Sequence, residues 1–139
     1  MPRRLLAFVF VAVVASVPAN ANLLDSWHEV QAQLSDGDMV GAEQAIAALQ
    51  EEAVELEVRR MSAFAAALVT WAQAHPGADG EAMLRFAKQL DPDYPSSYFL
   101  AAHWSAEKGA SIVALKETVA GLIALLEYES TRRAVGAGL

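Results

Sequence analysis

The sequence predicts an all-α fold, and three observations point to it. Apolar residues recur every three to four positions along the chain after residue 21, which is the period of an amphipathic helix. No stretch alternates apolar and polar residues in the way of a half-buried strand. Clusters of Gly, Pro, Asp and Ser interrupt the apolar pattern and mark turns. We therefore expect helices joined by short connections.

Six helices are predicted between these interruptions. The turn clusters lie at residues 35–38, 75–80, 90–95 and 108–109. A further break is predicted between Glu55 and Glu57, although no Gly or Pro marks it. In chain order the helices are predicted at 23–35, 39–55, 57–74, 79–90, 95–108 and 110–128.

Residues 86–100 resemble the junction between two tetratricopeptide repeats. One helix ends in Leu90, Asp91 and Pro92, and an aromatic residue, Tyr98, follows the proline by six positions. Ala114 lies 34 residues after Gly80, which is the period of this family. The aromatic and small positions of successive first helices are Trp27, Val30 and Leu34, then Phe64, Ala67 and Trp71, then Tyr98, Ala101 and Ser105.

The resemblance implies a short α-solenoid of about three hairpins, with repeats at 23–56, 57–94 and 95–128. About four extra residues enter near 57–60. Small residues at Ala42, Gly80 and Ala114 would let paired helices approach closely. The chain departs from the family in two ways. The first unit lacks a proline after its second helix, and the usual glycine is replaced by Gln31, Leu68 and Ala102. An unrelated six-helix bundle is the alternative.

The first 21 residues have the pattern of a secretory signal peptide. Arg3 and Arg4 precede an apolar run over residues 5–17, Pro18 ends it, and residues 19–21 supply small side chains for cleavage. We expect cleavage after Ala21 and export to the periplasm or the cell exterior. An uncleaved anchor is the alternative, but the run has thirteen residues, whereas a spanning helix needs roughly 20.

Composition narrows the function classes. The chain has no cysteine, which excludes a lipoprotein, a disulfide and a cysteine-ligated metal. The net charge is −7, and loss of Arg3 and Arg4 with the signal would make it −9. Nucleic acid is therefore not an expected partner, because phosphate binding needs clustered Lys and Arg. Neutral or basic protein surfaces fit the charge better, and the alternative is that the charge serves solubility alone.

If the resemblance holds, the first helix of each hairpin lines a concave groove that binds a protein or peptide. The Lys and Asn residues with which similar chaperone-docking repeats hold a terminal carboxylate are absent, so that binding mode is not expected. The groove positions are Asp25, His28, Ala32 and Ser35 in the first unit, Ser62, Ala65, Val69 and Gln73 in the second, and Ser96, Phe99, His103 and Glu107 in the third.

Catalytic and metal-binding patterns are weak. His103 and Glu107 are four residues apart on one helix face, and His28 could approach them to form a metal site or a small hydrolase. This enzyme is the rival hypothesis. The chain has no Gly-x-Ser-x-Gly motif, and Gly77 and Gly80 lack the Lys that a phosphate-binding loop requires. We predict no enzyme, no cofactor and no metal.

The last predicted helix carries more apolar residues than one neighbour can cover. Val113, Ala120 and Ile123 form one apolar stripe, which we predict to be a docking or self-association face. Residues 129–139 are predicted to be a tail, which could instead fold back over this face or, in a longer polypeptide, begin a membrane span at Arg132. A second stripe, predicted to pack on helix 95–108, consists of Ile112, Leu115, Val119, Leu122 and Leu126.

These observations predict an exported, non-catalytic protein-interaction module or scaffold of the cell envelope. Its partner would be a protein or peptide, bound in the groove or through the last helix, and a second copy is one such partner. Membrane contact is not predicted for the mature chain. The other hypotheses are a purely structural subunit of an envelope assembly and the N-terminal region of a longer membrane protein.

Overall fold

A computed structural model describes residues 21–137, except the side chains of Ala21, Val135 and Ala137. These residues form six helices and no strand, so the all-α prediction is confirmed. The predicted signal peptide lies outside the described residues, apart from its last position. The helices are α2 (Ala21–Asp36), α3 (Met39–Glu55), α4 (Ser62–Ala74), α5 (Ala78–Leu90), α6 (Pro95–Glu107) and α7 (Ser111–Ala137).

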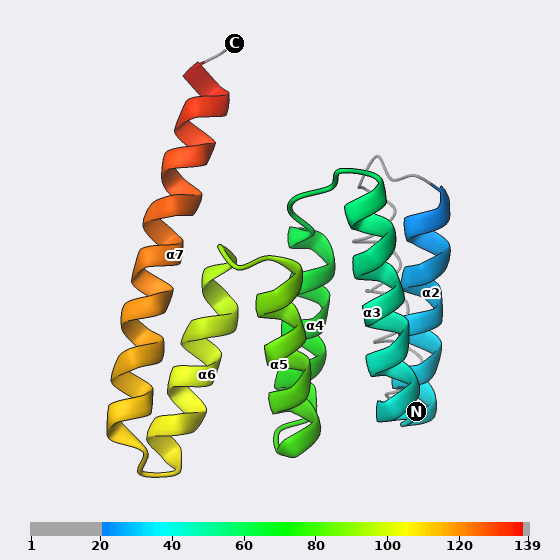
Figure 1. The fold of residues 1–139 in the computed structure, drawn as a ribbon. Coiled ribbons are helices and arrows are strands. Elements are labelled where there is room, and N and C mark those ends of the chain that lie inside the picture. The colour runs from blue at the N-terminus through cyan, green and yellow to red at the C-terminus, as the bar shows by residue number, and fades with distance from the viewer. Residues whose placement is uncertain (1–20, 138–139) are drawn as a thin grey trace.

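Consecutive helices pair into three hairpins, α2 with α3, α4 with α5, and α6 with α7 (Figure 1). The hairpins follow one another in chain order, with α4 and α5 in contact with α6, and α5 in contact with α3. The first hairpin and α7 therefore lie at opposite ends of the row (Figure 1).

The hydrophobic core belongs mainly to the first two hairpins. Its fully buried side chains include Ile46, Leu49 and Met83. The rings of Trp27 in α2 and Phe64 in α4 lie 4.8 Å apart and join the two hairpins. In α6 and α7 the buried side chains are small, and α6 adds the partly buried Leu100 and Trp104 to the core.

Three helices end in the same backbone motif. A residue with positive φ follows each of α2, α3 and α6 within two positions, namely Gly37 (75°), Glu57 (56°) and Gly109 (75°). After α3, the Val58 N–H donates to the Ala53 carbonyl over 2.8 Å, which is the long hydrogen bond of a Schellman motif. Glycine adopts this conformation at no steric cost, whereas a glutamate is strained in it.

The connection from α3 to α4 is longer than predicted. The helix predicted at 57–74 begins at Ser62, so the prediction of its start is wrong. The four extra residues at 57–60 lie in this connection, which is held to the end of α5. The Met61 N–H donates to the Leu90 carbonyl over 3.3 Å, and Arg60 pairs with Asp93 at 2.6 Å.

Asp91 joins the two ends of the second hairpin. Its side chain is buried, at 1% exposure. It accepts a hydrogen bond from the Ser62 hydroxyl at 2.5 Å and another from the Asp93 N–H at 3.1 Å. The first bond ties the start of α4 to the end of α5, and the second stabilises the turn into α6.

Two of the three predicted close contacts between helices are buried. Ala42 is fully buried. Gly80 is buried as well, and a Cβ there would lie 2.9 Å from the Trp104 ring, so α5 needs a glycine at this point. Ala114 is only half-buried.

The last helix is longer than predicted. It continues to Ala137, so the prediction that it ends at residue 128 is wrong, and residues 129–137 do not fold back over α7. At 1.5 Å per residue the 27 residues of α7 extend about 40 Å, about twice the length of the 13-residue α6. The C-terminal turns of α7 rise beyond the other helices (Figure 1).

Candidate interaction surfaces

Most of the predicted groove residues are open to solvent. In α2, Asp25 and His28 are exposed, as are Ala32 and Ser35. The exposed predicted positions in the other two first helices are Gln73 in α4 and Ser96, His103 and Glu107 in α6. These side chains are free to meet a partner.

Three predicted groove residues of α4 serve the fold instead. Ala65 is fully buried, Val69 is 4% exposed, and Ser62 is half-buried with its hydroxyl donating to Asp91. None of the three is among the solvent-exposed positions. The outer strip of α4 runs through Ala66 and Thr70, each one position after the buried pair Ala65 and Val69. Thr70 is the polar residue in this stretch. Its polarity is the feature of the sequence that could have predicted the exposed side of α4.

Phe99 faces α7 more than a groove. A Cβ on Gly121 would lie 2.8 Å from the Phe99 ring, so the ring rests on the α7 backbone at this glycine. The side chain retains 37% exposure. Phe99 therefore contributes chiefly to the contact between α6 and α7.

The three residues of the rival enzyme hypothesis, His28, His103 and Glu107, do not lie together at one site. His103 Nε2 lies 3.5 Å from Glu107 Oε1, and both side chains are about two-thirds exposed. His28 is on α2, and the second hairpin lies between α2 and α6 (Figure 1). Within residues 21–137, no three His, Asp or Glu side chains are placed to hold a metal ion.

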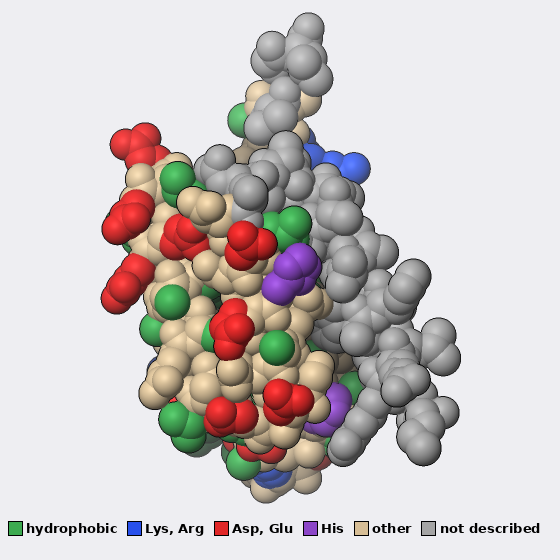
Figure 2. Space-filling model, turned by 90° about the vertical axis from the view of Figure 1, so that its right-hand side faces the viewer, with side chains coloured by type: hydrophobic (Ala, Val, Ile, Leu, Met, Phe, Trp, Pro, Cys, Tyr) green, Lys and Arg blue, Asp and Glu red, His purple; other side chains and the backbone are tan. Residues whose placement is uncertain are grey.

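The acidic charge is concentrated at one end. Residues 21–58 hold nine Asp and Glu and no Lys or Arg. Residues 59–139 hold eight acidic and eight basic residues and are neutral overall. The whole net charge of −9 after residue 20 therefore belongs to the first hairpin and its exit. Figure 2 views this end, where acidic side chains are spread over the described surface.

The opposite end, α7, exposes large apolar side chains on most of its circumference. Ile112 is 84% exposed and Leu126 is 71% exposed. The other large apolar side chains of α7 with at least 39% exposure are Val113, Leu115, Val119, Leu122, Ile123, Leu125 and Tyr128. No other described helix carries a comparable group.

The contact between α7 and α6 is made by small residues. Gly121 is buried and Ala124 is 4% exposed on this side of the helix. Glu117 adds an ion pair to Lys88 of α5 at 2.8 Å. The small residues of α7 leave room for the Phe99 ring of α6 at Gly121, while the large apolar side chains of α7 lie on its other sides.

This contact corrects the predicted orientation of α7. The stripe running from Ile112 to Leu126 was predicted to pack on α6, but all five of its members are exposed. In the predicted docking face, Val113 and Ile123 are exposed at 49% and 56%, and Ala120 is half-buried. Neither stripe is therefore covered as a whole by α6, the main neighbour of α7.

A shallow pocket of about 190 Å³ lies between α5, α6 and α7. Trp104 forms one wall. Lys88 pairs with Glu117 and Lys108 with Glu81 across the pocket, so both lysines are already neutralised by protein carboxylates. These two ion pairs therefore fasten the third hairpin to α5.

None of the described helices has the length and hydropathy needed to cross a bilayer. Comparison with protein-family models, curated proteins and solved structures gives no match. What the chain does is therefore inferred from its own surfaces.

Proposed function

We propose that the chain is a non-catalytic protein-interaction module of the cell envelope, built as a short α-solenoid of three tetratricopeptide-like hairpins. Three hairpins in chain order support the architecture. The architecture is also supported by the small residues Ala42 and Gly80 at helix contacts. The turn glycines Gly37 and Gly109 support it as well, since they lie at matching places in the first and third hairpins.

The exposed apolar surface of α7 carries the proposal. Soluble monomers seldom leave a large contiguous apolar patch in water, and such patches mark sites that bind other molecules. On α7 these side chains follow one another along several turns of one helix, which suits a docked helix better than a small ligand. Thus α7 is the main docking face.

The exposed strip of the first helices is the second proposed surface. It offers His28, Gln73 and His103 as hydrogen-bonding groups. The nine acidic residues at 21–58 create a negative field beside it, which attracts basic segments and repels acidic ones. A neutral or basic peptide is the expected occupant.

Site-specific photo-crosslinking in the native envelope tests both surfaces. A photoreactive amino acid at Leu122 on α7, or at Gln73 on α4, is expected to yield covalent adducts with protein. The matched control is Val40, an exposed valine of α3, which should yield few. Cross-linked protein from neither Leu122 nor Gln73 would contradict the proposed function.

A further inference from the structure

The outer side of α7 carries the spacing of a coiled-coil seam. Its five apolar residues are separated by three, four, three and four positions, which is the heptad pattern by which two helices pack along their length. Each is exposed by 46% or more. We name this set, Ile112, Leu115, Val119, Leu122 and Leu126, the outer seam.

The outer seam points away from the rest of the described chain. Successive residues of an α-helix are rotated by about 100°, so Val119 lies about 160° around the axis from Gly121. Gly121 faces α6, so the seam faces outward at the end of the row of hairpins (Figure 1). A helix docked there would meet no other described element.

Charge favours a second copy docked through its own α7. The acidic first hairpins repel one another, and pairing through α7 places them at the two far ends of the assembly. The α7 helix itself carries three acidic and three basic residues, so two copies of it meet without net repulsion. Docking of the first hairpin onto the seam is disfavoured, because α2 exposes the charged residues Asp25 and Glu29.

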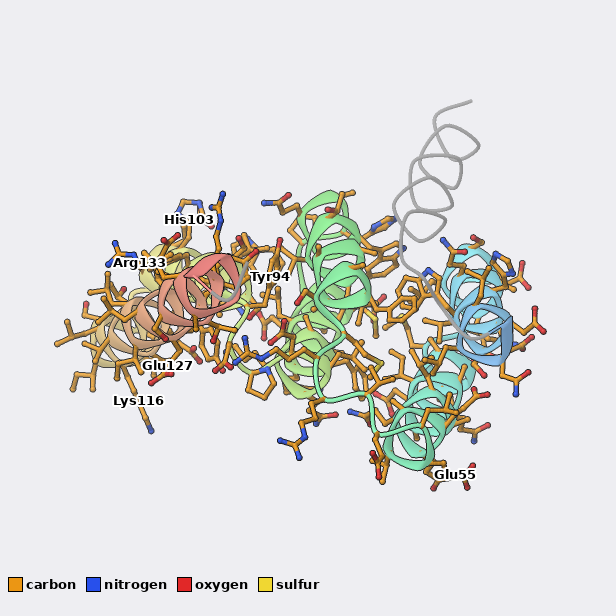
Figure 3. The ribbon with its side chains drawn as sticks, turned by 90° about the horizontal axis from the view of Figure 1, so that it is seen from above. Glu55, Tyr94, His103, Lys116, Glu127 and Arg133 are labelled. Atoms are coloured by element: carbon orange, nitrogen blue, oxygen red, sulfur yellow. The ribbon has the colours of Figure 1, made fainter. Side chains whose placement is uncertain are left out.

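Two charged residues beside the seam indicate the relative direction of the helices. Lys116 and Glu127 point to the same side of α7 (Figure 3). If two α7 helices lie antiparallel with Val119 opposite Leu122 of the other copy, Lys116 and Glu127 of opposite copies fall within about 3 Å along the axis. This arrangement makes the pair twice. In a parallel arrangement in register, this side of α7 falls on opposite flanks of the two copies, and Lys116 and Glu127 stay about 16 Å apart along the axis, so no such pair forms.

We infer that the outer seam is covered by the α7 of a second copy, forming an antiparallel two-helix interface flanked by two Lys116–Glu127 ion pairs. The inference rests on the proposed role of α7 as a docking face. It adds the identity of the docked helix and its direction.

A series of charge-swap variants tests the inference. Each protein is expressed from the full sequence and purified in the form that the cells produce. Analytical ultracentrifugation should show a dimer of the parent chain in the micromolar range. Lys116→Glu and Glu127→Lys should each weaken dimerisation about tenfold, because two attractions become two repulsions. The double variant should regain the parent affinity.

A matched pair of valine substitutions separates the seam from a general effect of added charge. Val119→Asp, in the seam, should give a monomer, whereas Val40→Asp, on exposed α3, should leave the dimer intact. Circular dichroism checks that each variant keeps its helices. A dimer that survives Val119→Asp, or a double charge-swap variant that stays weak, would overturn the antiparallel interface.

The outcome also distinguishes this inference from the proposed function. A monomeric parent whose Leu122 cross-links to another protein would overturn the second copy as the occupant while supporting α7 as a docking face. A monomeric parent with no cross-link from either tested surface would overturn both.

Discussion

Asp91 has more effect on the fold than its short side chain suggests. Its buried carboxylate accepts hydrogen bonds from the start of α4 and from the turn before α6. Buried acceptors left without a donor, or donors left without an acceptor, cost more than exposed pairs contribute. Asp91 therefore fixes the position of the start of α4 relative to the end of α5.

Asp91→Ala is expected to lower the free energy of unfolding by about 2 to 3 kcal/mol, because two donors lose a charged acceptor. Asp93→Ala breaks the partly exposed pair with Arg60 and should cost less than about 1 kcal/mol. Urea unfolding of both variants measures the difference. Equal losses would show that Asp91 has no special role.

Glu57 holds a positive φ of 56°, which strains any residue with a Cβ. Glu57→Gly should raise the free energy of unfolding by about 0.5 to 1 kcal/mol. Leu56, the preceding residue, has a φ of −89° and gains no such relief. Leu56→Gly should therefore destabilise the protein in the same thermal melts, and a loss of stability in both variants would contradict the assignment.

Tyr98 makes stability depend on alkaline pH. Burial raises its pKa above the ordinary 10.0, and the nearby carboxylates of Glu117, Asp93 and Asp91 add to the rise. Because the folded state favours the neutral phenol, this contribution is complete below pH 10 and is lost as pH rises through the higher folded pKa. Unfolding of Tyr98→Phe should show a shallower decline than the parent above pH 10. Identical slopes would contradict the shift.

At the scale of elements, α7 is attached mainly to α6 and not to the main core. Gly121 lets the Phe99 ring rest on its backbone, and the large side chains of α7 lie on its other sides. The main core lies in α2 to α5. Loosening α7 should therefore leave the first two hairpins folded.

Gly121→Ala should accelerate hydrogen exchange in α7 while leaving α4 protected, because the new methyl group meets the Phe99 ring. Gly136→Ala is the matched control and should not accelerate exchange in α7, because a Cβ added there would meet nothing within 4 Å. Slower exchange in α7 of Gly121→Ala would refute the contact.

Sequence patterns predicted helices best where a turn residue marks the end. Gly37, Gly109 and Pro95 carry such signals, and the helices beside them begin or end within one or two residues of the predicted positions. Glu57 is not a residue type that marks a turn. Its positive φ comes from the Schellman hydrogen bonds of the surrounding chain, which the sequence does not reveal. The start of α4 at Ser62 was missed for the same reason.

The interaction surfaces were only partly predictable. Hydrophobic periodicity identified two apolar stripes on α7, but the prediction that one of them packs on α6 is wrong. The contact uses Gly121 and Ala124, whose small side chains give a weak apolar signal. In α4, Val69 was assigned outward by repeat register, but packing of α4 between its neighbours buries it.

At the scale of the whole molecule, the two ends differ in kind. The first hairpin and the residues just after it, 21–58, hold all of the net negative charge after residue 20, and α7 at the other end exposes apolar side chains. The negative charge keeps the first hairpin in contact with water and favours basic over acidic partners. Covering the apolar side chains of α7, by contrast, lowers the free energy. This polarity is the physical basis for an interaction module.

The most direct measurement of the central claim, that α7 is covered in its native setting, is thiol labelling at single cysteines. The chain has no cysteine, so Leu122→Cys on α7 and Val40→Cys on α3 each introduce one thiol. We expect a water-soluble maleimide to label Val40→Cys much faster than Leu122→Cys in the native envelope, and both at similar rates after denaturation. Equal labelling of the two thiols in the native envelope would contradict the claim.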